Sequence, residues 1–160
     1  MNTHDISIQL NGRSVEASVE SNQPLVHFLR TEAGASDVKV GCGEGSCGTC
    51  TVLLDGELTN SCLVFTVQAD GAEITTVRSL GGGGKPLHPL QQSFVENGAA
   101  QCGFCTPGMV LTALWHVSRD KNMNRQEIRE AIGGNLCRCT GYTKIVDAIE
   151  AYADGGAEHD

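Results

Sequence analysis

The sequence predicts an α+β protein in which a β-rich half precedes an all-α half. Before Gly81 the apolar residues recur with the period of two that marks half-buried strands. Gly81-Gly82-Gly83-Gly84 then interrupts the pattern, as a connector between unlike halves does. After it the apolar residues follow the 3.6-residue period of helices. We therefore expect two domains, at residues 1–78 and 89–160, joined by a glycine-rich linker at 79–88.

The β half is expected to begin with a hairpin and a helix. The alternating apolar residues of the hairpin are Ile6, Ile8 and Leu10, then Val15, Ala17 and Val19. Asn11-Gly12 between them is a strong two-residue turn signal. A short helix follows, capped by Asn22 and stopped by Gly34, with Leu25, Phe28 and Leu29 on its apolar side.

A second hairpin and a last strand complete this half. Thr51–Leu54 and Glu57–Thr59 flank the turn signal Asp55-Gly56, and Ile74–Val77 has the pattern of a further strand. Two hairpins, one helix and a closing strand together suggest a small domain of β-grasp type.

Four short helices are expected after the linker. They run from Pro89 to Asn97, from Thr106, from Asn124 to Ile132, and from Tyr142 onward. Asn124 and Glu127 form a capping box, and His88 stands where it can help the first helix to start. Trp115 is expected in the core. Helices of this length form a small bundle.

The first cysteine group lies in a glycine-rich loop. Cys42, Cys47 and Cys50 follow the spacing C-x4-C-x2-C, and Cys62 comes later. This is the plant-type pattern that holds a [2Fe–2S] cluster. Glycines permit positive φ angles and a close approach of the backbone to a cluster. Backbone N–H groups can therefore turn toward the sulfurs. A disulfide knot or a zinc site is the competing interpretation, although zinc sites usually show two C-x2-C pairs.

The second cysteine group lies in the helical half. It consists of Cys102 and Cys105, followed later by Cys137 and Cys139. The first two precede a helix start, where free N–H groups and the helix dipole stabilise thiolates. In an extended segment Cys137 and Cys139 point to the same side. The resulting four-thiolate site suits zinc about as well as iron by its spacing, and the division of eight cysteines into two groups of four favours iron.

Composition and motifs exclude several other classes. The net charge of −8 and the 4% aromatic content argue against a nucleic-acid partner. The chain starts without an export signal, and its apolar runs are too short to span a membrane. In a reducing compartment a cysteine-rich chain binds metal more readily than it forms disulfides, so we expect a cytoplasmic metalloprotein. Familiar catalytic motifs are absent from the sequence, and no catalytic residue is assigned.

Three motifs taken together resemble one family. Residues 41–52 read GCGEGSCGTCTV, residues 101–108 read QCGFCTPG, and residues 134–142 read GNLCRCTGY. In this order, and over nearly the whole chain, they resemble the iron–sulfur subunit of the molybdenum hydroxylases. This is the xanthine oxidase family, which includes the small subunits of carbon monoxide dehydrogenase and 4-hydroxybenzoyl-CoA reductase. The sequence departs from the residues common in this family at Ser46, Thr49 and Lys144-Ile145, and none of these positions is a cysteine ligand.

The resemblance implies a plant-type ferredoxin-like β-grasp domain followed by a four-helix bundle. It also implies that each cysteine group holds a [2Fe–2S] cluster. The implied ligands are Cys42, Cys47, Cys50 and Cys62 for one cluster, and Cys102, Cys105, Cys137 and Cys139 for the other. By the same resemblance, Gln101 and Cys139 would approach a molybdopterin on a partner subunit.

The implied function is that of a non-catalytic electron-transfer subunit. Electrons would pass from a molybdopterin centre on a large subunit, through the cluster of the helical half and then the other cluster, to FAD on a medium subunit. The expected assembly is a dimer of heterotrimers. The alternatives are a free-standing ferredoxin-like electron carrier and a zinc-binding structural module. A carrier needs one exposed cluster rather than two in series, which disfavours that alternative.

Overall fold

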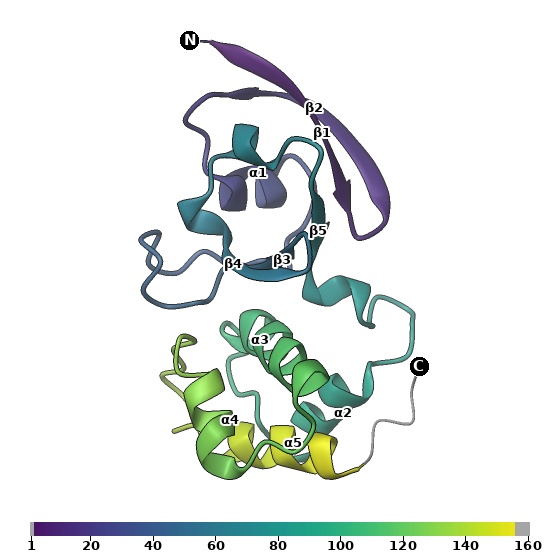
Figure 1. Cartoon of the computed structure of the whole chain (residues 1–160), viewed down its shortest axis with the longest axis vertical. Helices are drawn as coiled ribbons and strands as arrows, with labels where there is room; N and C mark the ends of the chain where they lie inside the picture. The colour runs from purple at the N-terminus through teal and green to yellow at the C-terminus, as the bar shows by residue number, and fades with distance from the viewer. Residues whose placement is uncertain (1, 156–160) are drawn as a thin grey trace.

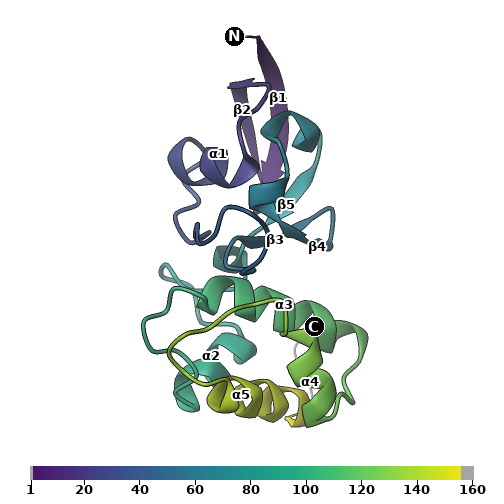
Figure 2. The same ribbon diagram turned by 90° about the vertical axis from the view of Figure 1, so that its left-hand side faces the viewer.

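The computed structural model describes residues 2–155 and shows two halves, each with its own apolar core. Figures 1 and 2 show the sheet-containing half stacked on the helical half along the long axis of the molecule. The chain is therefore an α+β protein, as the sequence predicts. Met1 and residues 156–160, at the outer ends of the two expected domains, lie outside the described residues.

The first half is built on a five-stranded mixed sheet with the strand order β2-β1-β5-β3-β4. The strands are β1 (Thr3–Leu10), β2 (Arg13–Glu20), β3 (Thr51–Leu54), β4 (Glu57–Asn60) and β5 (Glu73–Thr75). β1 pairs with β2 antiparallel and with β5 parallel, whereas β3 is antiparallel to both β4 and β5. Both predicted hairpins are confirmed.

Two boundaries in this half differ from the prediction. β5 ends at Thr75, because Val77 begins the 3-10 helix η3 (Val77–Ser79) and packs against the core of the helical half. Helix α1 (Leu25–Thr31) begins after Pro24 with no side-chain cap, so Asn22 is not its cap. The Leu25 N–H instead donates to the carbonyl of Val64 at 2.8 Å, and a neighbouring segment holds the helix start.

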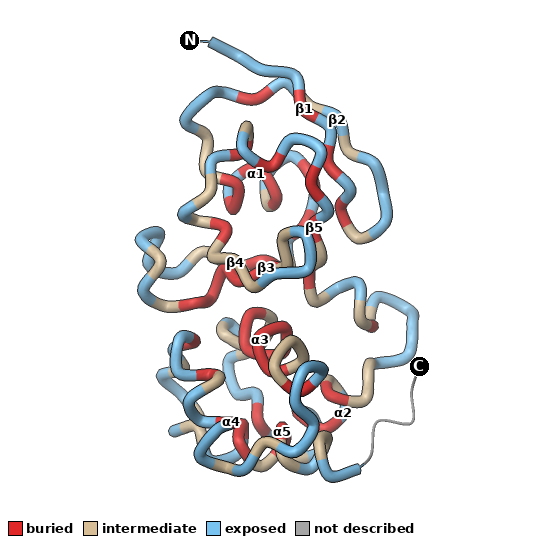
Figure 3. Tube along the Cα trace, in the orientation of Figure 1, coloured by how far each residue is buried: buried red, intermediate tan, exposed pale blue. Residues whose placement is uncertain are grey.

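The core of the first half lies between α1 and the sheet. Ile6, Ile8 and Leu10 alternate with exposed residues along β1, so one face of the strand is buried. Phe28 and Leu29 of α1 are completely buried against this face. Figure 3 shows this alternation as short buried stretches along the strands.

The second half contains the four predicted helices. They are α2 (Pro89–Glu96), α3 (Thr106–Arg119), α4 (Arg125–Ala131) and α5 (Thr143–Asp154). His88 caps α2 by accepting a hydrogen bond from the Leu90 N–H at Nδ1, over 3.1 Å. The capping box of Asn124 and Glu127 at α4 is confirmed. Among the described residues no helix is both long enough and apolar enough to cross a lipid bilayer.

The two halves meet in a seam where α3 lies against β3, β4 and η3. Trp115 lies in this seam, half-buried, and not in the core as expected, because α3 runs past the β3–β4 turn. Its indole N–H donates to the Gly56 carbonyl at 3.0 Å. The Arg119 guanidinium lies 3.6 Å from the centre of the Trp115 ring and pairs with Glu57 at 2.9 Å.

In the expected linker, Gly82 and Lys85 exchange two backbone hydrogen bonds of 3.3 Å and so form a tight turn.

Candidate metal centres

The loop between α1 and β3 carries Cys42, Cys47 and Cys50, and Cys62 follows β4 in the 3-10 helix η1 (Ser61–Leu63). The N–H of Cys42 donates to Cys47 Sγ, and the N–H of Glu44 donates to Cys42 Sγ, each at 3.4 Å. The backbone of this loop thus turns donors toward sulfur, as the glycine content predicts. Such donors stabilise a negatively charged group bound by the thiolates.

Two glycines of the loop meet different requirements. Gly45 has a left-handed φ of 82°, and a Cβ added there would lie 2.5 Å from Leu63 Cδ1. Gly41 has no left-handed φ, but a Cβ added there would lie 2.8 Å from Cys47 Sγ. The first glycine is needed for its backbone conformation and for space, and the second for the approach of a sulfur atom.

The first four thiols form two pairs. The side chain of Cys42 interacts with that of Cys47, and the side chain of Cys62 with that of Cys50. Hydrogen bonds from the Ser46 side chain and then the Glu44 N–H lower the pKa of Cys42 to about 6. Burial, followed by the contact with Cys50, raises the pKa of Cys62 to about 11. In the absence of a bound cluster, Cys42 therefore favours the thiolate and Cys62 the thiol.

The second four thiols also form two pairs. Cys139 Sγ donates to Cys102 Sγ at 3.5 Å, and Cys105 interacts with Cys137 through a side-chain hydrogen bond. The N–H of Phe104 and then the Cys139 thiol lower the pKa of Cys102, whereas donation to Cys102 raises the pKa of Cys139. The helices thus bring together cysteines from two segments distant in the sequence.

The inner pair of this group departs from one expectation. Cys105 is the N-cap residue of α3, yet burial, and then the neighbouring Cys137, raise its pKa to about 12. The helix start therefore does not make Cys105 a thiolate. At Cys137 burial opposes ionisation, but hydrogen bonds from Thr140 outweigh it and lower the pKa. The Thr140 Oγ1 lies 3.1 Å from Cys137 Sγ.

The arrangement of the thiols in pairs fits a two-iron cluster. The candidate ligands in each half are four cysteine thiols. A structural zinc ion takes four such ligands, whereas each iron of a [2Fe–2S] cluster takes two thiolates. Two pairs in each half are the donor set that a two-iron cluster requires, so the residues present fit that group.

The two pairs of the helical half differ in exposure. Cys102 and Cys139 are exposed, and Cys105 and Cys137 are half-buried. Gln101 is also exposed and directly precedes Cys102. The structure therefore places Gln101 and Cys139, the two residues expected to approach a partner's cofactor, on the outer side of the site.

A direct backbone contact links the two cysteine groups. The N–H of Leu136 donates to the carbonyl of Cys47 at 2.9 Å, so residues adjacent to Cys137 and within the first group touch. In Figure 1 the loops that carry the two groups lie on the same side of the molecule. Sequence reasoning missed this contact, because a backbone N–H leaves no signature in residue types.

Tyr142 is a second residue whose role the sequence did not reveal. The expected helix includes it, but it precedes α5 with a left-handed φ of 68°. Its hydroxyl accepts from the N–H of Cys137 at 2.8 Å and donates to the Asn135 carbonyl at 3.2 Å. Tyr142 therefore holds the segment that leads into Cys137. Its place in the GNLCRCTGY motif was the available signal.

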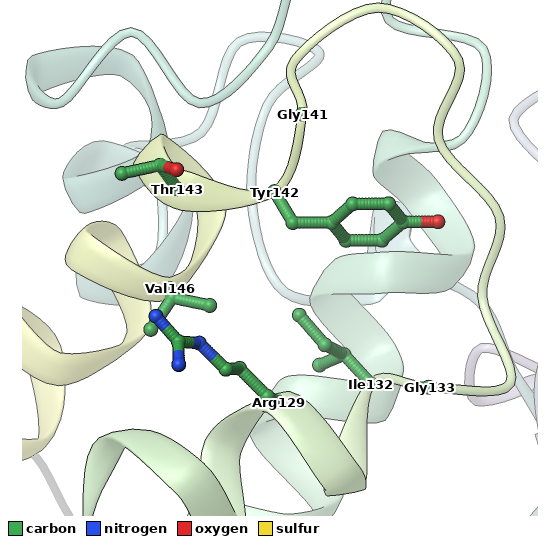
Figure 4. A pocket seen from close by; sticks show the side chains of 7 residues that line it. All are labelled: Arg129, Ile132, Gly133, Gly141, Tyr142, Thr143 and Val146. Carbon is green, nitrogen blue, oxygen red and sulfur yellow. The ribbon is translucent and has the colours of Figure 1, made fainter.

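The ring of Tyr142 also lines a pocket of about 450 Å³ between α4 and α5 (Figure 4). The other lining residues are Arg129, Ile132, Gly133, Gly141, Thr143 and Val146. No cysteine lines this pocket, so it is separate from both thiol sites.

Two family models divide the chain between them. A model described as a 2Fe-2S iron-sulfur cluster binding domain matches residues 8–75, and one described as a [2Fe-2S] binding domain matches residues 76–150. Each model contains one of the two cysteine groups.

Characterised proteins match the chain over nearly its full length. Caffeine dehydrogenase subunit gamma of Pseudomonas sp. (strain CBB1) is 46% identical over 94% of this chain and 92% of its own. The xanthine dehydrogenase iron-sulfur-binding subunit of Escherichia coli O157:H7 is 44% identical, over 92% of each chain. A chain in the crystal structure of quinoline 2-oxidoreductase from Pseudomonas putida 86 superposes with a TM-score of 0.90 at 44% identity, over 96% of this chain and 95% of that one.

Proposed function

Since this chain belongs to the iron–sulfur subunits of the molybdenum hydroxylases, we propose that it relays electrons between two larger subunits through its cysteine sites in series. It is the electron-transfer subunit of an oxidoreductase complex and does not itself act on substrate. Each bound [2Fe–2S] cluster supplies a centre that takes up and releases one electron. The ligands we propose are the eight cysteines, as two pairs in each half.

The hydrogen bond between Leu136 and Cys47 carries this proposal. It joins the peptide that precedes Cys137 to the carbonyl of a cysteine in the other group, at 2.9 Å. A few covalent bonds and this one hydrogen bond therefore connect a thiol of one site with a thiol of the other. A series relay needs its two sites near each other, and this contact brings them together, whereas two independent carriers have no need of it.

Exposed apolar side chains support docking of partners next to both sites. Leu63 and Phe65 follow Cys62, and they are 62% and 47% exposed. Phe104 lies between Cys102 and Cys105, Leu136 directly precedes Cys137, and they are 47% and 54% exposed. Large apolar side chains in water are typical of surfaces that partner proteins cover. One such surface lies beside each cysteine site, which suits a subunit placed between two others.

The finer assignments extend this proposal. The outer pair, Cys102 and Cys139, with Gln101 beside it, would face a molybdopterin on the large subunit, and the first group would face FAD on a medium subunit. The assembly would be a dimer of heterotrimers. The domains would be a ferredoxin-like β-grasp at 1–78 and a four-helix bundle at 89–160, joined by the linker at 79–88. Eight free thiols suit a reducing, cytoplasmic compartment.

The two alternatives are less well supported. The full-length relatives are named as subunits, which disfavours a free-standing carrier. Both family models describe [2Fe–2S] binding, which disfavours a zinc module.

The test is to purify the complex anaerobically and to determine iron, acid-labile sulfide and zinc. We expect iron and sulfide for two [2Fe–2S] clusters per copy of this chain, and two paramagnetic signals after reduction with dithionite. We also expect the chain to elute with larger partners. A colourless protein that contains zinc and no sulfide, or a chain that elutes as a monomer with one signal, would overturn the proposal.

A further inference from the structure

We propose that Asn135 is the positioning residue that sets the spacing and orientation of the two cysteine sites relative to each other. The inference rests on the proposed relay function and assigns to one side chain the alignment on which that relay depends.

The side chain of Asn135 joins the two sites directly. It is only 3% exposed, and its Nδ2 donates to the carbonyl of Gly48 at 2.9 Å. Gly48 lies between Cys47 and Cys50, and Asn135 lies two residues before Cys137. A buried amide N–H that lost its acceptor would pay the cost of its desolvation, so burial favours keeping Asn135 Nδ2 on this carbonyl.

The Gly48 carbonyl is held by several donors at once. Besides Asn135, it accepts from the Thr51 hydroxyl at 2.6 Å and from the Thr51 N–H at 3.2 Å. Asn135 Nδ2 also lies 3.5 Å from the Thr51 hydroxyl oxygen. This carbonyl cannot shift without disturbing all three donors. The contact from Asn135 is therefore anchored to a fixed point of the first half.

Close packing leaves this contact little freedom to slide. A Cβ added to Gly108 of α3 would lie 2.5 Å from the Gly48 carbonyl oxygen. Gly48 has a left-handed φ of 64°, and a Cβ there would collide with the carbonyl of Gly134. Glycines thus bring three backbone segments together around the amide of Asn135.

Asn135 is equally well held on its own side. Its N–H donates to the Ile132 carbonyl at 2.9 Å, and its carbonyl accepts from the Tyr142 hydroxyl. A cavity of about 200 Å³ adjoins Asn135 in the seam and is bordered by Thr59, Thr112 and His116. Beside this cavity the hydrogen bonds of Asn135 join the two halves next to the cysteine groups, whereas the contacts of Trp115 and Arg119 join them at the β3–β4 turn.

The experiment measures the magnetic interaction between the two reduced clusters in the intact complex. Because this interaction depends on the distance and orientation of the two centres, it reports alignment and not the presence of each cluster. In Asn135→Ala we expect the splitting to be weakened and broadened, with unchanged iron content and unchanged midpoint potentials. Asn97→Ala is the matched control, since the Asn97 amide also donates to a backbone carbonyl, that of Ser93 at 2.9 Å, but within the helical half.

Gly108→Ala tests the same contact without altering Asn135. Its methyl group would push on the Gly48 carbonyl, so we expect the splitting to change here too. Unchanged splitting in Asn135→Ala would overturn the role of Asn135. Loss of a cluster in that variant would overturn it as well, since Asn135 would then be needed to build a site and not to align two. If the wild-type complex shows fewer than two signals, it is the relay itself that fails.

Discussion

The two cysteine sites of this protein are built in opposite ways. The first site takes Cys42, Cys47 and Cys50 from one loop and only Cys62 from elsewhere. The second site takes its cysteines from two segments, before α3 and before α5, that the helical half brings together. Backbone conformation and glycines shape the first site, whereas tertiary packing shapes the second.

This difference has consequences for how each site fails. A loop site depends on the φ angles and free space of a few residues, so local substitutions should destroy it and leave the other site intact. A site assembled by helices depends on side chains that hold its segments, such as Tyr142. Its losses should therefore be graded, and they should follow the stability of the helical half.

The largest expected effect comes from removing a thiol of the second site. In Cys139→Ser the exposed pair with Cys102 is lost, so reduction of the flavin by substrate should be abolished. The first site should keep its paramagnetic signal, because none of its ligands changes. Rapid-mixing absorbance and paramagnetic resonance check the two halves of this prediction. Arg138→Ala is the control, and flavin reduction at the wild-type rate in Cys139→Ser would contradict the series relay.

The next effect separates the glycines of the first loop. Gly45→Val should prevent the first cluster from assembling, for two reasons. A valine is strained at a φ of 82°, and its Cβ would lie 2.5 Å from Leu63 Cδ1. Gly43→Val should be milder, since Gly43 has a φ of 73° but no other atom within 4 Å of an added Cβ. Iron and sulfide analysis with visible spectra measures both. A normal spectrum in Gly45→Val would show that the loop is not constrained as described.

A smaller effect is expected where tertiary contacts hold the second site. Tyr142→Phe leaves the Cys137 N–H and the Asn135 carbonyl without the hydroxyl that bridges them, at a cost of about 1–3 kcal/mol in the free energy of unfolding. The second cluster should load less completely, while the first is unaffected. Denaturant unfolding and cluster content give the readouts. Tyr152→Phe, in the helix α5 that follows Tyr142, serves as the control, and equal effects of the two variants would contradict the bridge.

The smallest effect concerns pH and the seam between the halves. Burial, and then the charge of Arg119, lower the pKa of His116 below its ordinary value of 6.5. Just below that pH the unfolded chain binds a proton that the folded chain does not, so stability falls as pH drops through 6.5. In His116→Gln this fall should be shallower, as measured by urea unfolding from neutral to mildly acidic pH. A fall of the same steepness in His116→Gln would contradict this origin.

The amino-acid sequence by itself determined the features that depend on near neighbours. Cysteine spacing identified both groups, Asn11-Gly12 and Asp55-Gly56 located the hairpins, and Asn124 with Glu127 located a helix start. Local sequence patterns predict these features because a turn, a cap or a loop around a metal is formed by residues a few positions apart.

Only the tertiary structure decided how the parts meet. Asn135 and Gly48 are 87 residues apart in the chain, and Trp115 and Gly56 are 59 apart, so no local pattern relates them. The same holds for the partners of Cys105 and Cys137 and for the burial that raises the pKa of Cys105. Packing two cores against each other sets these contacts, and with them the distance across which two cysteine sites can exchange an electron.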